Sequence, residues 1–388
     1  MSFQETTSVS WFGRIKRSLV GLLGGVLLIV GMIVLLFWNE GRAVTTARSL
    51  AEGAGVVVSV DADRVNPALE GSLIHVSGSV STSDRPKDPE FGIVADGLRL
   101  VRKVEMYQWI ESSKSETRTK LGGGEETVTT YTYAKGWSDR PHDSSDFRQP
   151  EGRTNPPMEV RGESFQVESA TLGAFTLSPR VIRMIGGETA LPIGQDRLNA
   201  IQSAIGAGVR ARLADGRIYI GQNPQEPQVG DYRIGYQVVP AGSASIVGRQ
   251  AGSGFEPYQT QAGNALLMVE SGTVSAQQIF ADAMSANTVV TWILRVGGLI
   301  FLIVGFAMLM APLGVIGDVI PFVGSIVRMG TGLVAGVLGV LVGSVTIAIA
   351  WFWYRPLVSI VVLALGLGIA WLLTQRAKKK AQLASAAA

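Results

Sequence analysis

The chain has 388 residues, of which 47% are hydrophobic and 17% charged, and its mean hydropathy of +0.27 is high for a wholly water-soluble protein. Its formal net charge is +3 and the basic residues are dispersed, so charge gives no support for a nucleic-acid partner. The absence of cysteine excludes a disulfide framework, a thiol nucleophile and a thiolate metal site.

The first apolar segment, residues 19–38, contains no charged side chain and has the length of about 20 residues that a membrane-spanning helix needs. A cleavable signal peptide is the alternative, but the segment is long and ends in Phe37 and Trp38 rather than in small residues. Basic side chains precede it, which favours a cytosolic location for residues 1–18: Arg14, Lys16 and Arg17. The sequence therefore predicts an uncleaved first transmembrane helix.

Residues 39–290 are polar and predict a large β-rich domain on the other side of the membrane from the cytosol. Alternating hydrophobic residues and β-branched residues predict its strands: Gly55–Val60, Leu73–Val80, Leu98–Ile110, Thr127–Trp137, Arg217–Ile220, Tyr232–Val239 and Ala265–Glu270. Glu111–Glu125 is rich in Ser, Thr, Lys and Gly and predicts the end of a long hairpin. Helical patterns occur at Gln195–Ile205 and Ser275–Asn287.

Three further membrane helices are predicted at residues 291–316, 329–353 and 357–373, followed by a basic cytosolic tail at 374–388. Residues 317–328, which contain Asp318, Pro321 and Arg328, predict either a loop at the membrane surface or a re-entrant segment. The predicted fold class is thus an α+β membrane protein with four transmembrane helices, one N-terminal and three C-terminal, and an extracytoplasmic β-rich domain.

The residues give little support for catalysis. His75 and His142 are the only histidines, and they lie in different contexts without metal-ligand spacing. No catalytic, metal or cofactor-binding residue is predicted. Small residues spaced four apart instead predict close helix packing, within the chain or between copies in a homo-oligomer: Gly21, Gly25, Gly332, Gly336, Gly339 and Gly343.

Several short motifs resemble the transmembrane protein 43 family, also called LUMA. They are distributed along the whole chain and include these residues: Asn39, Glu40, Gly41 and Arg42; Glu105, Tyr107 and Trp109; Trp292 and Arg295; and Tyr354, Arg355 and Pro356. The resemblance implies four spans, cytosolic termini and a large extracytoplasmic or lumenal domain.

The resemblance also bears on partners and location. Eukaryotic members are proteins of the endoplasmic reticulum and inner nuclear membrane that organise complexes with emerin and lamins. The Ala-rich, Gly-rich and cysteine-free character of this chain suits a bacterial member in the inner membrane, where those partners do not exist.

Two functions are predicted. The first is a non-enzymatic scaffold that organises membrane protein complexes. Its predicted partners are the lipid bilayer, further copies of itself in a homo-oligomer, and other membrane proteins. The alternative is an ion channel or transport component with a path beside the broken segment, where Asp318 and Arg328 would line it.

Overall fold

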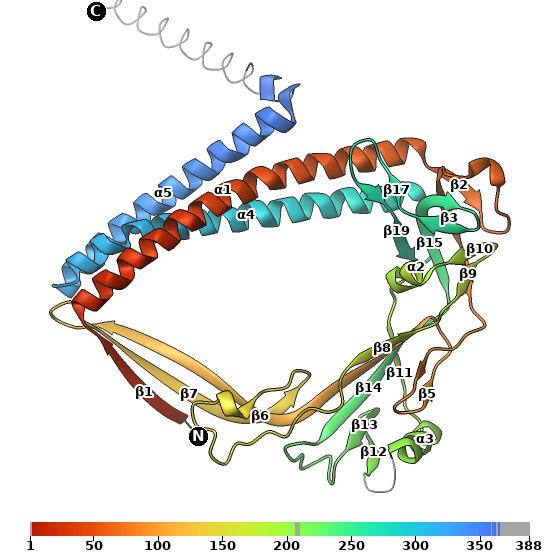
Figure 1. Ribbon diagram of the computed structural model, residues 1–388, viewed down its shortest axis with the longest axis horizontal. Helices are drawn as coiled ribbons and strands as arrows, with labels where there is room; N and C mark the ends of the chain where they lie inside the picture. The colour runs from red at the N-terminus through yellow and green to blue at the C-terminus, as the bar shows by residue number, and fades with distance from the viewer. Residues whose placement is uncertain (1, 206–209, 358, 362–363, 365–388) are drawn as a thin grey trace, which may run out of the picture. The chain divides into compact units, whose positions relative to one another are not determined.

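The computed structural model describes residues 2–205, 210–357, 359–361 and 364 (Figure 1). The chain divides into two compact units. The sheet unit comprises Met1–Thr6, Ser49–Glu116 and Thr127–Ala283. The helix unit comprises Thr7–Arg48, Thr117–Glu126 and Met284–Ala388.

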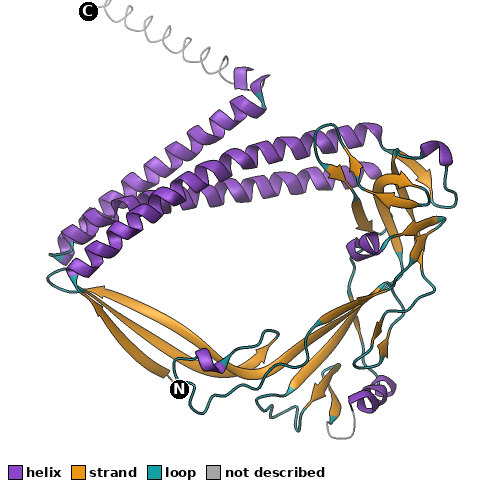
Figure 2. Cartoon of the chain, in the orientation of Figure 1, coloured by secondary structure: helices purple, strands orange, loops and turns teal. Residues whose placement is uncertain are grey.

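Two large sheets form most of the sheet unit (Figure 2). The first has the order β1-β7-β6-β14-β13-β12, with β11 also paired to β14 and β8 to β6. Its strands are β1 (Ser2–Val9), β6 (Arg99–Thr119), β7 (Glu125–Ser138), β8 (Glu163–Gln166), β11 (Thr189–Leu191), β12 (Ala211–Ala214), β13 (Arg217–Ile220) and β14 (Tyr232–Val239).

The second sheet has the order β10-β9-β3-β15-β16, with β19 also paired to β15 and β2 to β3. Its strands are β2 (Val58–Asp61), β3 (Leu73–Ser81), β9 (Ala170–Leu172), β10 (Phe175–Leu177), β15 (Ser243–Ala251), β16 (Gly254–Glu256) and β19 (Met268–Ser271). Two short hairpins, β4 (Lys87–Asp88) with β5 (Ile93–Val94) and β17 (Tyr258–Gln259) with β18 (Ala265–Leu266), and helices α2 (Pro179–Met184) and α3 (Gln195–Ile205) complete the unit.

Each large sheet has its own hydrophobic core. One core gathers buried side chains of β3, β9, β10 and β15, including Ile74, Phe175 and Ile246. The other gathers those of β6, β13 and β14, including Met106 and Ile234. Burying such side chains contributes roughly 1.5–3 kcal/mol each. The hydrophobic residues whose alternation predicted β3, β6, β13 and β14 therefore contribute to the two cores, together with side chains of strands that were not predicted.

The strand predictions over β3, β7, β13 and β14 are confirmed to within two residues, and the helix at Gln195–Ile205 is confirmed as α3. The prediction at Gly55–Val60 is partly wrong, because the first helix continues to Val56 and leaves only β2 extended. The end of the hairpin was predicted over Glu111–Glu125, but its strands are longer than predicted. Strand β6 extends to Thr119, and the turn occupies only residues 120–124.

Strand β1 was not predicted, and its place in the sheet affects the membrane topology. In the sheet unit Gln4 Nε2 donates to Thr130 Oγ1 at 3.3 Å, the rings of Phe3 and Tyr131 lie 6.2 Å apart, and Glu5 pairs with Arg148. Strands in one ladder lie on one side of a bilayer, because a polar hairpin cannot cross lipid. The pairing therefore predicts the same side of the membrane for β1 and the sheet unit, whereas the charges that precede residue 19 predict opposite sides.

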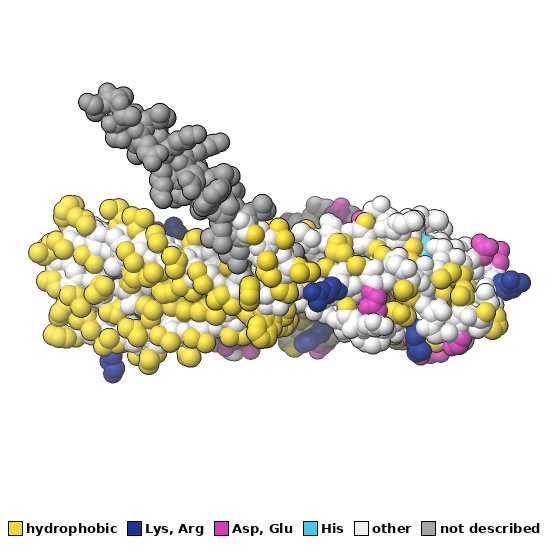
Figure 3. Space-filling model, turned by 90° about the horizontal axis from the view of Figure 1, so that it is seen from above, with side chains coloured by type: hydrophobic (Ala, Val, Ile, Leu, Met, Phe, Trp, Pro, Cys, Tyr) yellow, Lys and Arg dark blue, Asp and Glu magenta, His cyan; other side chains and the backbone are white. Residues whose placement is uncertain are grey.

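Three long helices form the helix unit: α1 (Trp11–Val56), α4 (Ala276–Gly317) and α5 (Pro321–Tyr354). By length and composition each could cross a membrane. Large hydrophobic side chains such as Leu27, Ile300 and Val337 are exposed on them, and Figure 3 shows hydrophobic side chains over this unit. The predicted fourth span, 357–373, and the tail lie almost entirely outside the described residues.

The predicted loop over residues 317–328 is wrong in length. Helix α4 continues through Pro312 to Gly317, and α5 begins at Pro321, so only residues 318–320 separate the helices. Proline is favourable at the first position of a helix, where its missing N–H needs no partner, and one proline within an apolar helix is tolerated. Prolines and glycines that predicted an interruption therefore lie within helices.

Candidate functional site

The family-like motifs from three distant segments meet in the helix unit, around the carboxylate of Glu40. This side chain is fully buried on α1 and receives two hydrogen bonds from Arg295 of α4, Nε to Oε1 at 2.6 Å and Nη2 to Oε2 at 2.7 Å. Trp351 of α5 donates its indole N–H to Oε2 at 2.8 Å. We call Glu40, Arg295 and Trp351 the clamp, because they join all three helices.

Aromatic rings surround the guanidinium of the clamp. The Arg295 guanidinium carbon lies 4.9 Å from the ring centre of Trp292 and 5.6 Å from that of Trp351. A planar guanidinium can bind a carboxylate through two hydrogen bonds and stack on aromatic faces at the same time. The clamp therefore satisfies both charges in a place that water reaches poorly.

A second polar layer lies beside the clamp. Asn39 is buried and donates from Nδ2 to the carbonyl oxygen of Thr291 at 3.2 Å. Arg42 donates to Asn287 Oδ1 and Thr291 Oγ1, each at 3.0 Å, and Asn287 Nδ2 donates to the carbonyl oxygen of Ala43 at 3.0 Å. These bonds extend the α1–α4 contact by more than one turn. Sequence reasoning did not single out Asn287 or Trp351, because neither forms a recognisable pattern on its own.

The third motif segment closes the same region from α5. The Tyr354 ring lies 5.3 Å from that of Phe37, and any side-chain carbon at Gly41 would overlap the Tyr354 ring. Arg48 donates to the carbonyl oxygen of Tyr354 at 3.1 Å. Arg355 ends α5, and its backbone N–H donates to the carbonyl oxygen of Trp351; Pro356 follows. A side chain at position 41 would therefore force the Tyr354 ring to move.

The other motif residues, Glu105, Tyr107 and Trp109, lie on β6 in the sheet unit and do not join this cluster. Glu105 accepts two hydrogen bonds from Arg233, at 2.6 and 2.8 Å, and one from Arg217 at 2.9 Å. These hydrogen bonds, foremost those from Arg233, lower the pKa of the Glu105 carboxyl, although its partial burial opposes them. Glu105 thus fastens β6 to β13 and β14.

Tyr107 and Trp109 contribute to a row of half-buried aromatic side chains along β6 and β7. The Trp137 ring lies 5.2 Å from Tyr107 and 6.1 Å from Tyr219, and the guanidinium of Arg233 lies 4.7 Å from its centre. Lys135 Nζ lies 5.0 Å from the Trp109 ring. We call Tyr107, Trp109 and Trp137 the aromatic row.

We predict an acid-dependent effect of Glu105→Gln. A lowered pKa means that the carboxylate adds stability above the pKa of an unfolded glutamate, about 4.3, and that this contribution disappears as the pH falls through the lower folded value. At pH 7 the variant should have a lower melting temperature than the parent. Between pH 7 and pH 3 its melting temperature should fall by less than that of the parent. Circular dichroism of the purified chain measures both, and Glu116→Gln, an exposed carboxylate on the same strand, is the control.

A buried polar cluster in the sheet unit was missed by sequence reasoning. Asp88 is fully buried and accepts two hydrogen bonds from Arg102 Nη1, at 3.0 and 2.8 Å, and one from the Tyr236 hydroxyl at 2.7 Å. Burial, aided by the hydrogen bond to Asp88, raises the pKa of Tyr236. Because all three groups are matched, the cluster is architectural, and no local pattern around Asp88 could have indicated it.

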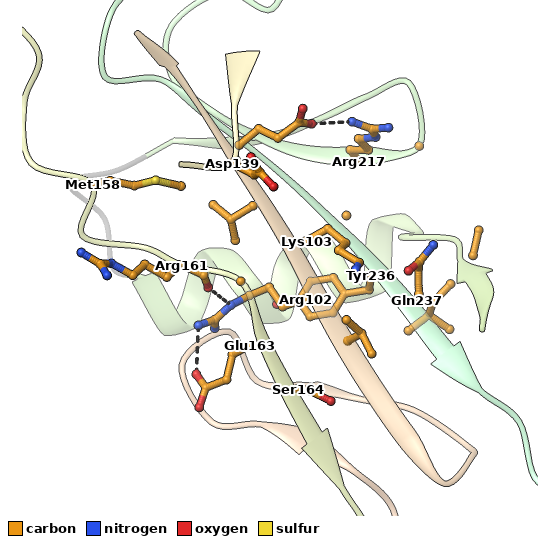
Figure 4. Close-up of a pocket in the computed structure, with 18 of the residues that line it drawn as sticks. Arg102, Lys103, Asp139, Met158, Arg161, Glu163, Ser164, Arg217, Tyr236 and Gln237 are labelled. Carbon is orange, nitrogen blue, oxygen red and sulfur yellow. Dashed lines mark hydrogen bonds and ion pairs between the residues drawn. The ribbon is translucent and has the colours of Figure 1, made fainter. Parts of the chain in front are cut away.

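A hollow of about 940 Å³ with both apolar and charged lining residues opens on the first sheet near this cluster (Figure 4). Cationic and anionic side chains both line it, among them Lys103, Arg161, Glu105, Asp139 and Glu163. The mixture favours neither an anionic nor a cationic ligand.

The two histidines contact different residues and do not form a joint site. His75 Nδ1 lies 3.1 Å from Ser59 Oγ and Nε2 lies 2.9 Å from the carbonyl oxygen of Val274, and burial lowers its pKa. His142 Nε2 lies 3.2 Å from Ser138 Oγ. Across the described part of the chain, no group of three or more His, Asp or Glu side chains is placed to hold a metal ion.

The six predicted packing glycines divide into two sets. A side chain at Gly25 would meet the backbone of Gly305 on α4, and side chains at Gly339 and Gly343 would meet Ile303 and Leu299 on α4. Among the described residues, none comes within 4 Å of a side-chain carbon placed at Gly21, Gly332 or Gly336. Close approach of the described helices therefore accounts for the first set and not for the second.

Asp318, predicted to line a path in the channel alternative, is fully buried at the turn between α4 and α5. It binds Arg14 Nη2 at 2.6 Å and also pairs with Arg328. The hairpin turn lies against the same end of the helices, because Arg14 Nη1 donates to the carbonyl oxygen of Gly123 at 2.6 Å and Gly122 N–H to that of Val319 at 3.2 Å. Trp11 donates to the carbonyl oxygen of Val315 at 2.8 Å.

Comparisons with known proteins agree on one family. A family model described as Transmembrane protein 43 matches residues 106–356. Transmembrane protein 43 of mouse is 30% identical over 89% of this chain and 87% of its own length, and that of human is 30% identical over 91% and 89%. The Drosophila melanogaster homologue is 28% identical over 73% of this chain and 74% of its own length. No solved structure matches. The chain, with its three membrane-capable helices and its β-rich unit, belongs to the transmembrane protein 43 family.

Proposed function

We propose that this protein is a non-enzymatic scaffold that organises protein complexes in its membrane, by binding other membrane proteins and further copies of itself. One observation carries the proposal: the polar groups of the converging motif bind one another. Glu40, Arg295 and Arg42 each have their partners within the helix unit. Groups that are already matched in this way hold helices together rather than perform chemistry.

The aromatic row supplies a surface for a protein partner. Trp and Tyr are the residues that contribute most at protein interfaces, and Tyr107, Trp109 and Trp137 are neither buried nor fully exposed. The cations Lys135 and Arg233 hold two of these rings in place. Such preorganised aromatic side chains lose little freedom on binding.

In-cell crosslinking tests the proposal. The full-length protein is crosslinked in its host, purified in mild detergent, and its mass and co-purifying proteins are determined. We expect defined partner proteins with the parent chain and their loss with Trp109→Ala combined with Trp137→Ala. Leu121→Ala, at a hairpin residue that is 87% exposed, is the control and should keep them. A parent chain that yields only monomer would contradict the proposal.

The channel alternative has less support. Asp318 is buried between two arginines rather than lining a cavity, and a carboxylate bound in this way offers no site to a passing ion. Asp318→Asn should accordingly leave ion flux into reconstituted vesicles unchanged, and an altered flux would restore the channel hypothesis.

A further inference from the structure

A small cavity of about 290 Å³ lies among the helices of the helix unit, near the turn that holds Asp318. Its walls carry small or apolar residues of α4 and α5, two guanidinium groups and one hydroxyl: Ala307, Ala311, Gly314, Val315, Gly332, Arg14, Arg328 and Thr331. Among the described residues that line it there is no carboxylate. The lining therefore combines cationic groups with apolar surface.

The two arginines differ in how fully they are bound. Arg14 is 8% exposed and directs its guanidinium to Gly123, Asp318 and Glu125. Arg328 is 45% exposed and uses only Nη1, toward Asp318, so its Nε and Nη2 groups keep free donors among the described residues. Arg14 binds Glu125 as well as Asp318, whereas Arg328 binds Asp318 through one nitrogen and has donors left for a further anion.

The surroundings decide which anion can bind these donors. Large hydrophobic side chains close in sequence to the lining residues are exposed: Leu313, Ile316, Phe322, Ile326, Met329 and Leu333. In a membrane these side chains contact lipid, where a free guanidinium donor is costly. Exposed basic residues one turn along α1, Lys16 and Arg17, add positive charge at the same helix end. A ligand that joins an anion to a hydrocarbon chain meets both requirements.

We propose that this cavity binds one anionic phospholipid, with its phosphate on Arg328 and an acyl chain along Ala307, Ala311 and Gly332. Arginine binds phosphate through paired donors, and Arg328 retains such a pair. A zwitterionic lipid fits less well, since its ammonium group would find no carboxylate in the cavity wall. The proposal also gives a role to Gly332, beside which the structure leaves open space.

Native mass spectrometry of the full-length protein tests the site. The protein is purified in mild detergent, titrated with phosphatidylglycerol or phosphatidylcholine, and the fraction carrying one lipid is measured. We expect phosphatidylglycerol to bind at least about tenfold more tightly, because both lipids offer a phosphate to Arg328 but the ammonium group of phosphatidylcholine finds no carboxylate in the cavity wall. Glycerol 3-phosphate, which has the phosphate but no acyl chain, should not displace it.

Two variants remove the two halves of the site. Arg328→Gln removes the charge, and Gly332→Leu fills the acyl end while all charges remain. Gly336→Leu is the matched control, because position 336 also has open space beside it but does not line the cavity. Both site variants should lose at least about tenfold in phosphatidylglycerol affinity, and the control should bind as the parent does. Equal binding by the parent, Gly332→Leu and Gly336→Leu would overturn the proposal, and displacement by glycerol 3-phosphate would assign the site to a soluble phosphate instead.

Discussion

Glu40→Gln should lower the free energy of unfolding by about 3–5 kcal/mol, the largest effect that we expect from a single substitution in this protein. The change leaves the Arg295 guanidinium, which is 12% exposed, without the one carboxylate that pairs with it among the described residues. It also weakens the acceptor of the Trp351 indole N–H, so that all three helices lose a contact. Thermal unfolding of the detergent-purified protein, followed by circular dichroism, measures the loss.

Glu52→Gln is the matched control for this prediction. Glu52 lies on the same helix and accepts the backbone N–H groups of Gln261 and Ala262, at 2.9 and 3.1 Å. These hydrogen bonds lie near solvent, so their loss should cost only about 1 kcal/mol. Equal effects of the two substitutions would show that the clamp is no stronger than an ordinary surface contact.

The second large effect concerns the side of the membrane on which the N-terminus lies. Because β1 belongs to the same ladder as β7, we expect cysteines placed at Thr6 and Glu168 to react with a membrane-impermeant maleimide from the same side. Both positions are exposed in the sheet unit, and the natural chain has no cysteine to interfere. Intact and permeabilised cells are compared.

A paired variant tests the strand contact itself. With cysteines at Gln4 and Thr130, whose side chains lie 3.3 Å apart, a short bis-maleimide should join the two positions in intact membranes. If the cysteines at positions 6 and 168 are labelled from the same side, α1 does not cross the membrane once between them. Labelling from opposite sides, without crosslinking, would instead support the placement predicted from the charges that flank residues 19–38.

Sequence patterns predicted the helices and strands whose conformation depends on neighbouring residues in the chain. The apolar run of residues 19–38 and the alternating patterns at Leu73–Val80 and Tyr232–Val239 predicted their elements, because period and length alone distinguish helix from strand there. Strand β15 was missed because Ser243, Ala244 and Gly248 have weak β propensity, and its neighbours β3 and β19 fix its conformation instead. For β1 too, the partner strand lies more than 100 residues away.

The candidate site shows the same limit. The family-like motifs singled out Glu40, Arg42 and Arg295, but nothing in their spacing showed that they meet, because α1 and α4 are separated by more than 200 residues. Trp351 was missed because a tryptophan near the end of an apolar helix is ordinary at a membrane surface. Its role depends on a carboxylate of another helix.

A double-mutant cycle between Glu40 and Arg295 tests most directly whether the converging motif is a structural clamp. Unfolding free energies are measured for the parent, Glu40→Gln, Arg295→Gln and the double variant. We predict that the second substitution costs far less once the first is present, with a coupling of about 2–3 kcal/mol, because each single change leaves one buried polar group unmatched. Additive losses, with a coupling below about 0.5 kcal/mol, would show that the two residues act independently and would contradict the clamp.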